Sequence, residues 1–183
     1  TQTTPIQLCL MTAQIANGGY KITPKILTDD NQLTSEQIKK VMQDSKLNDS
    51  FEPLYNDKKN IKIIQETMFS STNELRGTSY KSRIEDPKYQ FAGKTGTAQV
   101  KRISKREREL DLKTFQIPYE ERDHALYVAF GPYRKPRYAV SIIVEHGGSG
   151  SSAAAPMAKE LFKLIVNRHQ YRKKLPDYKE FNI

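Results

Sequence analysis

The chain has 183 residues, of which 37% are hydrophobic and 28% are charged, and its formal net charge is +9 at pH 7. This length suits one domain with a sizeable core, and the lack of a long apolar run or a signal peptide predicts a chain that is soluble as written. The single cysteine, Cys9, excludes an internal disulfide and a cysteine-based metal site.

The first predicted element is a helix over residues 4–17. It begins with a capping box, in which Thr4 is the N-cap, Pro5 takes the first helical position and Gln7 reaches back to the cap. Two consecutive glycines at 18–19 end it, because glycine readily adopts the backbone conformation that terminates a helix.

Two more helices are predicted in the first half. A second capping box, at residues 34–37, opens a helix over 34–46. Spaced apolar side chains predict a third helix over 60–75, and Gly77 follows as its end signal.

Three β-strands follow, over residues 90–100, 124–131 and 138–146. The second and third are joined by a short turn at 132–136 that has proline at both ends, which is typical of a hairpin. The third strand is almost continuously apolar, which predicts a central strand covered on both faces. Together with the helices, the strands predict an α+β fold in which helices flank an antiparallel sheet.

The connection over residues 101–123 is long, and more than half of its residues are charged. Connections of this length are usually functional loops or disordered segments. Because it joins the first strand to its neighbour, we expect it to lie beside a ligand groove and to be mobile without a partner. The last predicted helix spans 152–168, and Ser149 and the serines that follow it are expected to form a flexible turn and cap that helix.

The chain ends in a basic tail over residues 169–183. Basic residues cluster around its start, at Arg168, Arg172, Lys173 and Lys174. No nucleic-acid motif accompanies these residues, so we predict a solvated tail and no nucleic-acid partner. A basic surface that faces anionic lipid or cell wall also fits this composition.

The first predicted strand carries a Lys-Thr-Gly-Thr motif. Lys94 and Gly96 fall on one face of the strand, and Thr95 and Thr97 on the other. An ammonium is a compact charge and hydroxyls are orientable donors, so this combination favours binding of an anion. Gly96 has no side chain, which allows a ligand backbone to lie close to the strand.

Two other interpretations fit the triplet alone. Gly93-Lys94-Thr95 ends like a P-loop, but that motif needs a glycine where Lys88 stands, and residues 97–100 do not continue as a helix. The second is an ordinary exposed strand whose lysine has no role, because three-residue motifs are common by chance.

The order of several segments distinguishes among these interpretations. The chain resembles the C-terminal part of the transpeptidase domain of class B penicillin-binding proteins, especially the elongation type. The resemblance covers nearly the whole chain apart from 28–60 and 101–123. It rests on Thr-Pro-Ile-Gln-Leu at 4–8, Ile-Ile-Gln-Glu-Thr-Met at 63–68, the Lys94 strand, and the segments at 124–133 and 145–150. It implies a partial penicillin-binding transpeptidase fold, which is related to that of the serine β-lactamases.

The resemblance also implies roles for the motif. Lys94 and Thr97 are the expected catalytic residues: Lys94 supports proton transfer, and the backbone N–H of Thr97 supplies one oxyanion-hole donor. Lys94, Thr95, Gly96 and Thr97 are the expected substrate-binding residues, and the strand edge pairs with the substrate backbone. No cofactor or metal is implied, and His124, His146 and His169 are too scattered to suggest a zinc site.

The partners implied by the resemblance are peptidoglycan stem peptides, β-lactams, the N-terminal half of the domain and membrane proteins of the elongation complex. The implied location is the periplasmic face of the bacterial inner membrane, with an anchor outside this chain. Without the other half of the domain, the strand over 138–146 is expected to expose an edge and to pair with a second copy.

The family's nucleophile motif, Ser-x-x-Lys, does not occur in the sequence. Thr78-Ser79-Tyr80-Lys81 has its spacing but begins with threonine. Ser71-Thr72-Asn73 matches the family's Ser-x-Asn, but it lies after the helix that this motif should precede. The sequence therefore predicts a substrate-binding wall that lacks a nucleophile and is inactive alone. The alternative is a non-enzymatic cell-envelope module that binds D-Ala-D-Ala peptides or a partner protein.

Overall fold

The computed structural model describes residues 3–24, 52–101 and 112–173. Its main elements, in chain order, are α1 (Pro5–Ala16), α3 (Lys58–Asn73), β1 (Ala92–Ala98), β2 (His124–Gly131), β3 (Tyr138–Val144) and α5 (Ala155–Lys173). The helix predicted over 34–46 lies outside the described residues.

The strands form an antiparallel sheet in the order β1-β2-β3. In register, Lys94 lies opposite Val128, and Thr95 lies opposite Tyr127. The described chain therefore has the α+β architecture that the sequence predicts. In the described sheet β3 lies at an edge, as expected for this strand without the other half of the domain. Its residues are mostly only partly buried, so the full cover on both faces that its apolar composition predicts is not present in the described chain.

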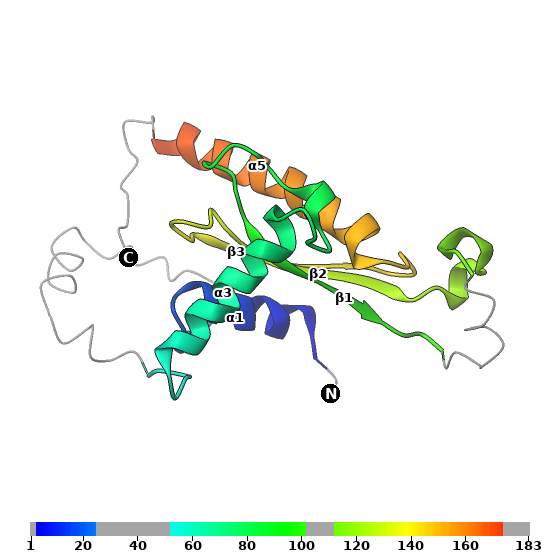
Figure 1. Cartoon of the computed structure of the whole chain (residues 1–183), viewed down its shortest axis with the longest axis horizontal. Coiled ribbons are helices and arrows are strands. Elements are labelled where there is room, and N and C mark those ends of the chain that lie inside the picture. The colour runs from blue at the N-terminus through cyan, green and yellow to red at the C-terminus, as the bar shows by residue number, and fades with distance from the viewer. Residues whose placement is uncertain (1–2, 25–51, 102–111, 174–183) are drawn as a thin grey trace, which may run out of the picture.

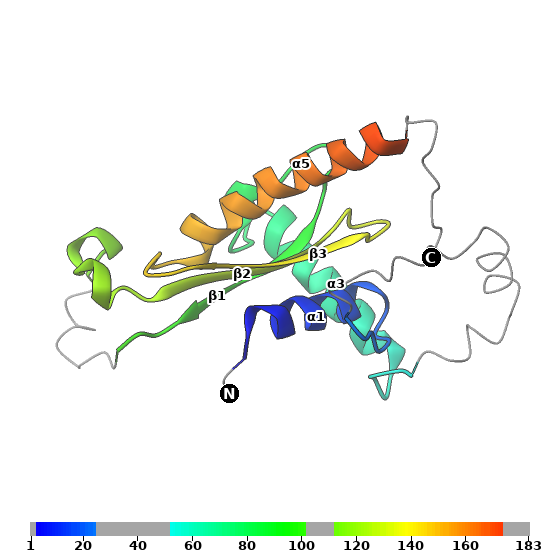
Figure 2. The ribbon, with the colours of Figure 1, turned by 180° about the vertical axis from the view of Figure 1, so that it is seen from behind.

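The sheet lies between two layers of helices (Figures 1 and 2). α5 runs along one face, α1 packs on β3 from the other, and α3 runs obliquely past β1. On the α5 side, Tyr127 and Phe91 are fully buried, and the Phe91 ring stacks on Phe162 with centroids 4.9 Å apart. On the α1 side a smaller cluster gathers around Met68 and Phe130. Apolar burial on both faces thus fixes the position of β2.

The capping box of α1 is confirmed. The Thr4 hydroxyl accepts from the backbone N–H of Gln7, and the Gln7 side chain accepts from the backbone N–H of Thr4. Gly18 and Gly19 both have positive φ angles, 94° and 91°, directly after the helix. These glycines turn the chain back because such angles are costly for any residue with a Cβ.

α3 is shifted by two residues from the predicted span of 60–75. Asp57 is its N-cap and accepts from the backbone N–H of Lys59. The helix ends at Asn73, and the extended Glu74 follows as its C-cap. Gly77 then brings the chain back against the helix, where a Cβ would lie 2.3 Å from the Ser71 carbonyl oxygen.

The C-terminal helix differs from its prediction at both ends. A π-turn over Gly150–Ala154 precedes α5, and Ser149 makes no side-chain capping bond to it. α5 continues to Lys173, so the first residues of the predicted tail over 169–183 are helical. In the part of the chain that the structure describes, no helix is long and apolar enough to cross a membrane.

The connection predicted as a loop over 101–123 contains ordered turns in its described part. Two 3-10 turns, Thr114–Gln116 and Tyr119–Glu121, follow one another. Each is closed by backbone hydrogen bonds, such as that from the N–H of Gln116 to the carbonyl of Lys113, at 2.8 Å. The segment from 112 onward is therefore folded against the sheet end rather than extended.

Candidate functional site

The Lys-Thr-Gly-Thr motif lies within β1, which pairs with β2 along one side only among the described residues. The N-terminal end of the outer side is covered, because the Asn73 side-chain amide donates to the Phe91 carbonyl at 2.9 Å. Further along, Thr97 and Ala98 are exposed. The described part of β1 thus presents an open edge beside the two motif threonines, and an extended ligand could pair there as an added strand.

Lys94 is exposed, and its ammonium donates to the carbonyl of the next residue, Thr95, at 3.0 Å. The strand register places it on the α1 side of the sheet, opposite Val128. The flexible four-carbon stem allows the ammonium to move from this position toward a ligand at the strand edge.

Thr95 and Thr97 lie on the opposite face from Lys94, as the alternation of the strand requires. Thr95 is partly buried and Thr97 is exposed. The Thr95 hydroxyl has a neighbour from outside the sheet, the hydroxyl of Thr78, at 3.4 Å. In the sequence, Thr78 stands out only as the first residue of a segment that has the Ser-x-x-Lys spacing but begins with threonine. No local pattern indicates the contact between Thr78 and Thr95.

Gly150 packs closely against the backbone of Gly96 in the motif strand. A Cβ added to Gly150 would lie 2.4 Å from the Leu126 carbonyl oxygen and 2.7 Å from that of Gly96. By contrast, a Cβ on Gly96 would meet only Leu126 Cβ, at 3.4 Å. The start of the π-turn therefore packs directly on the backbone of the motif strand, and the predicted flexible turn around Ser149 is instead a close-packed support.

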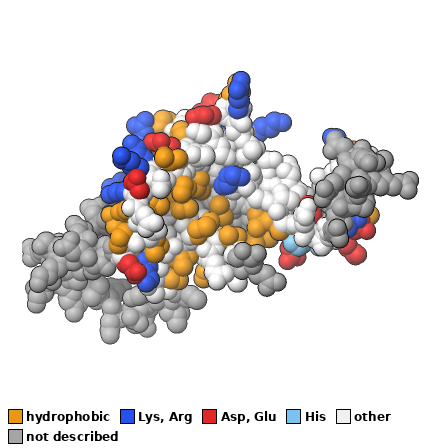
Figure 3. Space-filling model, turned by 60° about the horizontal axis from the view of Figure 1, so that its bottom comes forward, with side chains coloured by type: hydrophobic (Ala, Val, Ile, Leu, Met, Phe, Trp, Pro, Cys, Tyr) orange, Lys and Arg blue, Asp and Glu red, His pale blue; other side chains and the backbone are white. Residues whose placement is uncertain are grey.

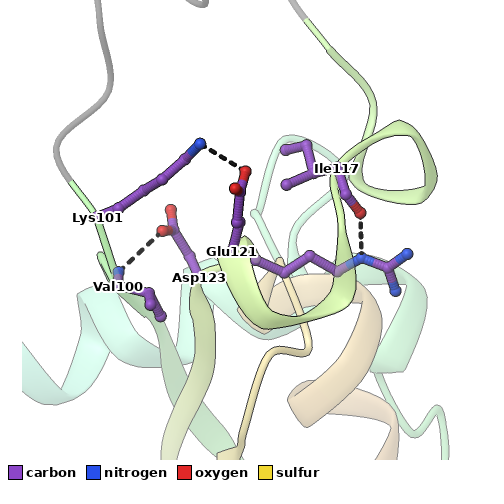
Figure 4. Close-up of polar contacts among 6 residues, drawn as sticks. Val100, Lys101, Ile117, Glu121 and Asp123 are labelled. Atoms are coloured by element: carbon purple, nitrogen blue, oxygen red, sulfur yellow. Dashed lines mark hydrogen bonds and ion pairs between the residues drawn. The ribbon is translucent and has the colours of Figure 1, made fainter.

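Polar contacts close the far end of the strand pair (Figure 4). The backbone N–H of Val100 donates to the Asp123 carboxylate at 3.3 Å, and the Lys101 ammonium pairs with Glu121 at 2.6 Å. The Arg122 side chain donates to the carbonyl of Ile117 at 2.9 Å. The two ends of the 101–123 connection are therefore joined just beyond the motif.

Two histidines lie at the same end. His124 opens β2 and its Nδ1 accepts from the backbone N–H of His146 at 3.0 Å. The rings pack edge to face at 4.8 Å. The contacts of His124 and His146 place both histidines in the packing of the strand ends. Within the described ranges, no group of three or more metal-ligating side chains lies together.

A buried hydroxyl cluster supports the motif from the core. The Tyr127 hydroxyl lies 2.9 Å from that of Thr72 and 3.0 Å from that of Ser79. Burial raises the pKa of Tyr127, and the two hydroxyl neighbours partly offset that rise. Gly93 provides the space for this ring, because a Cβ there would lie 2.3 Å from the Tyr127 oxygen.

Ser71 of the Ser-x-Asn match and Ser149 of the glycine-rich turn have structural contacts. Ser71 Oγ lies 3.1 Å from the hydroxyl of Thr78, and its carbonyl accepts from Ser79. Ser149 Oγ lies 3.0 Å from that of Ser151. None of the contacts found for these serines in the described chain involves a histidine or lysine that could act as a base.

The sequence is similar to known proteins along most of its length. A model of the penicillin binding protein transpeptidase domain matches residues 1–163. The peptidoglycan D,D-transpeptidase MrdA of Haemophilus influenzae is 30% identical over 98% of this chain, and that of Acinetobacter baumannii is 36% identical over 87%. The matched regions are 25% and 22% of those proteins, so this chain spans about a quarter of their length.

Solved structures give the same result. The penicillin-binding protein PBP2 of Helicobacter pylori, in complex with MreC, superposes with a TM-score of 0.67 at 28% identity, over 92% of this chain and 25% of that one. PBP2 of Pseudomonas aeruginosa, in complex with WCK 5153, superposes with a TM-score of 0.59 at 30% identity, over 90% of this chain and 30% of that one. The sheet and helices described above are therefore a partial version of that fold.

Proposed function

Because the chain belongs to the penicillin-binding protein transpeptidase family, we propose that it is part of a peptidoglycan D,D-transpeptidase. Relatives that bear that name match it over most of its length, which supports the proposal. Since the chain spans about a quarter of those relatives, the activity belongs to a longer protein in which this chain supplies the substrate-binding strand.

The proposed reaction is serine acyl transfer between two stem peptides. A serine outside this chain attacks the penultimate D-Ala carbonyl, the terminal D-Ala leaves, and the acyl group passes to an amine of the neighbouring peptide. A β-lactam imitates the D-Ala-D-Ala end and acylates the same serine, so the protein binds penicillin.

In this proposal the motif residues divide the work. The hydroxyls of Thr95 and Thr97 bind the terminal carboxylate of the substrate, and Lys94 stabilises that charge and supports proton transfer. The backbone N–H of Thr97 donates to the oxyanion that develops on the attacked carbonyl. Gly96 leaves room for the substrate backbone along the strand edge.

The observation that carries the proposal is the position of the motif on the open side of β1. Lys94, Thr95 and Thr97 all belong to one four-residue stretch of β1. Among the described residues, β1 has no partner strand on its outer side. This arrangement brings a cation, two hydroxyls and backbone donors to one edge, which suits a peptide that ends in a carboxylate.

The proposed setting is the periplasmic face of the inner membrane, as part of the machinery that elongates the cell wall. The Helicobacter pylori PBP2 structure is a complex with MreC, which supports a partner of that kind for the full-length protein. The remaining half of the transpeptidase domain is the second proposed partner, because it would bring the nucleophile to β1.

A fluorescent penicillin tests the proposal. The full-length gene product and this chain alone are each incubated with the probe, denatured and separated by electrophoresis. We expect covalent label on the full-length protein and none on the chain. An unlabelled full-length protein would reject the proposal, and label on the chain alone would reveal a nucleophile within it.

A second candidate function is a non-enzymatic module that binds D-Ala-D-Ala peptides or a partner protein of the cell envelope. The missing Ser-x-x-Lys motif favours it. Penicillin labelling together with calorimetry separates the two functions. A binding module would remain unlabelled by penicillin but would still bind a D-Ala-D-Ala peptide in the calorimeter.

A further inference from the structure

The Thr95 hydroxyl does not stand alone at the strand edge. Thr78 Oγ1 lies 3.4 Å from Thr95 Oγ1, which is at the outer limit of a hydrogen bond. Thr78 is exposed and comes from the turn after α3, 17 residues earlier in the chain. A threonine hydroxyl can turn its proton freely unless a neighbour restricts it, so Thr78 is placed to orient the Thr95 hydroxyl.

Thr78 is itself fixed from the helix behind it. Its hydroxyl lies 3.1 Å from Ser71 Oγ, and the next residue, Ser79, donates both its backbone N–H and its hydroxyl to the Ser71 carbonyl, each at 3.0 Å. Gly77 lets the turn approach this closely, because it has no Cβ to meet the same carbonyl. The turn over 77–79 therefore has a definite position on the last turn of α3.

The turn is also tied to the sheet from inside. Ser79 is buried, and its hydroxyl lies 3.0 Å from that of Tyr127. Tyr127 is the register partner of Thr95 across β1 and β2. Thr95 and Tyr127 are thus connected twice, through the strand pairing and through the turn that carries Thr78 and Ser79, and this closed arrangement resists independent movement of either side.

A consistent direction of hydrogen bonding follows. Each hydroxyl has one proton to donate and lone pairs to accept with. If Ser71 donates to Thr78, and Thr78 donates to Thr95, the proton of Thr95 is left to point at a ligand. A chain of this kind also polarises its last member, which strengthens its donation to an anion.

We propose that Thr78 is a positioning residue that directs the Thr95 hydroxyl toward the substrate carboxylate, and that Ser71 holds Thr78 in place. This proposal rests on the function proposed above, in which the Thr95 hydroxyl binds the substrate carboxylate. It adds two residues, from the C-terminal end of α3 and the turn after it, that act on the substrate only through the motif strand.

The test is penicillin acylation of the full-length gene product. The acylation rate is measured against penicillin concentration and separated into the dissociation constant of the initial complex and the first-order acylation rate. Thr78→Val keeps the shape of the side chain and removes its hydroxyl. Loss of one neutral hydrogen bond corresponds to about a three- to tenfold rise in the dissociation constant, with the first-order rate nearly unchanged. Thr78→Ser should restore wild-type binding, and Ser71→Ala should raise the constant by less than Thr78→Val.

A double variant shows whether Thr78 acts through Thr95. Thr95→Val alone should weaken binding, and adding Thr78→Val should weaken it no further, because the group it orients is already gone. Thr67→Val is the matched control. Thr67 lies on α3, the helix that precedes the turn, and its exposed hydroxyl donates to the backbone carbonyl of Ile63 at 2.7 Å. This variant should bind as the wild type does.

The outcomes separate the two proposals. A normal dissociation constant for Thr78→Val, or an equal further loss in the double variant, overturns the positioning role and leaves the transpeptidase assignment intact. If Thr95→Val binds penicillin as the wild type does, the carboxylate assignment fails, and with it the inference for Thr78. A fall in the first-order rate that Thr78→Ser does not restore would indicate a general disturbance of the site and also overturns the proposal.

Discussion

Lys94 is the only charged residue of the Lys-Thr-Gly-Thr motif, and its side chain leaves the strand on the opposite face from the two threonine side chains. Charge attraction acts over a longer range than a hydrogen bond and depends less on angle. In the proposed site, Lys94 therefore supplies most of the attraction for the substrate carboxylate, while Thr95 and Thr97 fix its position.

This division gives a prediction for Lys94→Ala in the full-length protein. Removal of a hydrogen bond to a charged group corresponds to about 1.5–3 kcal/mol, or about a ten- to hundredfold slower acylation by penicillin. Thr97→Val should cost less, because it spares the backbone N–H. Stopped-flow acylation measures both variants, and an unchanged rate in Lys94→Ala would reject the assignment.

The Tyr127 hydroxyl predicts a dependence of stability on pH. Its pKa is raised by burial above the ordinary value of about 10. Because the pKa is raised in the folded state, the stabilisation by the protonated Tyr127 hydroxyl is fully present below about pH 10. It is lost as the pH rises through the folded-state pKa. The melting temperature of the chain should therefore fall above about pH 10.

The variant Tyr127→Phe isolates this contribution. At pH 7 it should cost about 1 kcal/mol, because the Thr72 and Ser79 hydroxyls lose a partner but keep their bonds to backbone carbonyls. Between pH 9 and 11 its melting temperature should fall less steeply than that of the wild type. Parallel curves for the two proteins would show that Tyr127 does not titrate with the raised pKa.

At the scale of the elements, the sequence predicted what depends on neighbours in the chain. The capping box at Thr4 and the three strands follow from local patterns, and the structure contains them. The contact of Gly150 with Gly96, and that of Thr78 with Thr95, join segments distant in sequence, and no local pattern encodes them. The apolar run of β3 predicted a strand covered on both faces, but the described strand is mostly only partly buried, because composition indicates which residues favour burial and not what covers them.

The close packing at Gly150 predicts a contrast between two glycine variants. Gly150→Ala places a methyl group against the backbone oxygens of Leu126 and Gly96, and overpacking of this kind costs about 1–3 kcal/mol. Gly96→Ala meets only a side-chain carbon at an ordinary distance, so the fold should tolerate it.

The two variants should differ in function as well. We expect Gly150→Ala to lower the melting temperature of the chain, whereas Gly96→Ala should melt as the wild type does. In the full-length protein, Gly96→Ala should still slow penicillin acylation, because the methyl group occupies the edge that receives the ligand backbone. Normal acylation by Gly96→Ala would contradict the proposed path of the substrate.

At the scale of the whole molecule, the side that carries α1 and α3 exposes large apolar side chains, which Figure 3 shows in orange. Ile6 and Met11 on α1 are 53% and 45% exposed, and Ile63 on α3 is 58% exposed. Exposed apolar groups of this size often mark an interface. Ile143, on the β3 edge, is 37% exposed on the same side of the sheet.

We predict that the chain alone associates with itself through β3, because β2 is its one partner strand among the described residues and an open strand edge can pair with a second copy. Light scattering at micromolar concentration should show a dimer or a larger species. Ile143→Lys adds a charge to that edge and should restore the monomer, whereas Ile63→Lys on α3 should not. A monomeric wild-type chain, or dissociation by Ile63→Lys instead, would exclude pairing through β3.

The single cysteine of the chain lies between α1 and the sheet edge. The Cys9 thiol donates to the Ala139 carbonyl of β3 at 3.4 Å, and burial raises its pKa. Thiol reagents attack the exposed thiolate, so the partial burial of Cys9 and its raised pKa should slow its modification. Because the thiol is only partly exposed, the rate of Cys9 labelling reports on the cover of α1, and any partner that covers this helix in the assembled protein should slow that rate further.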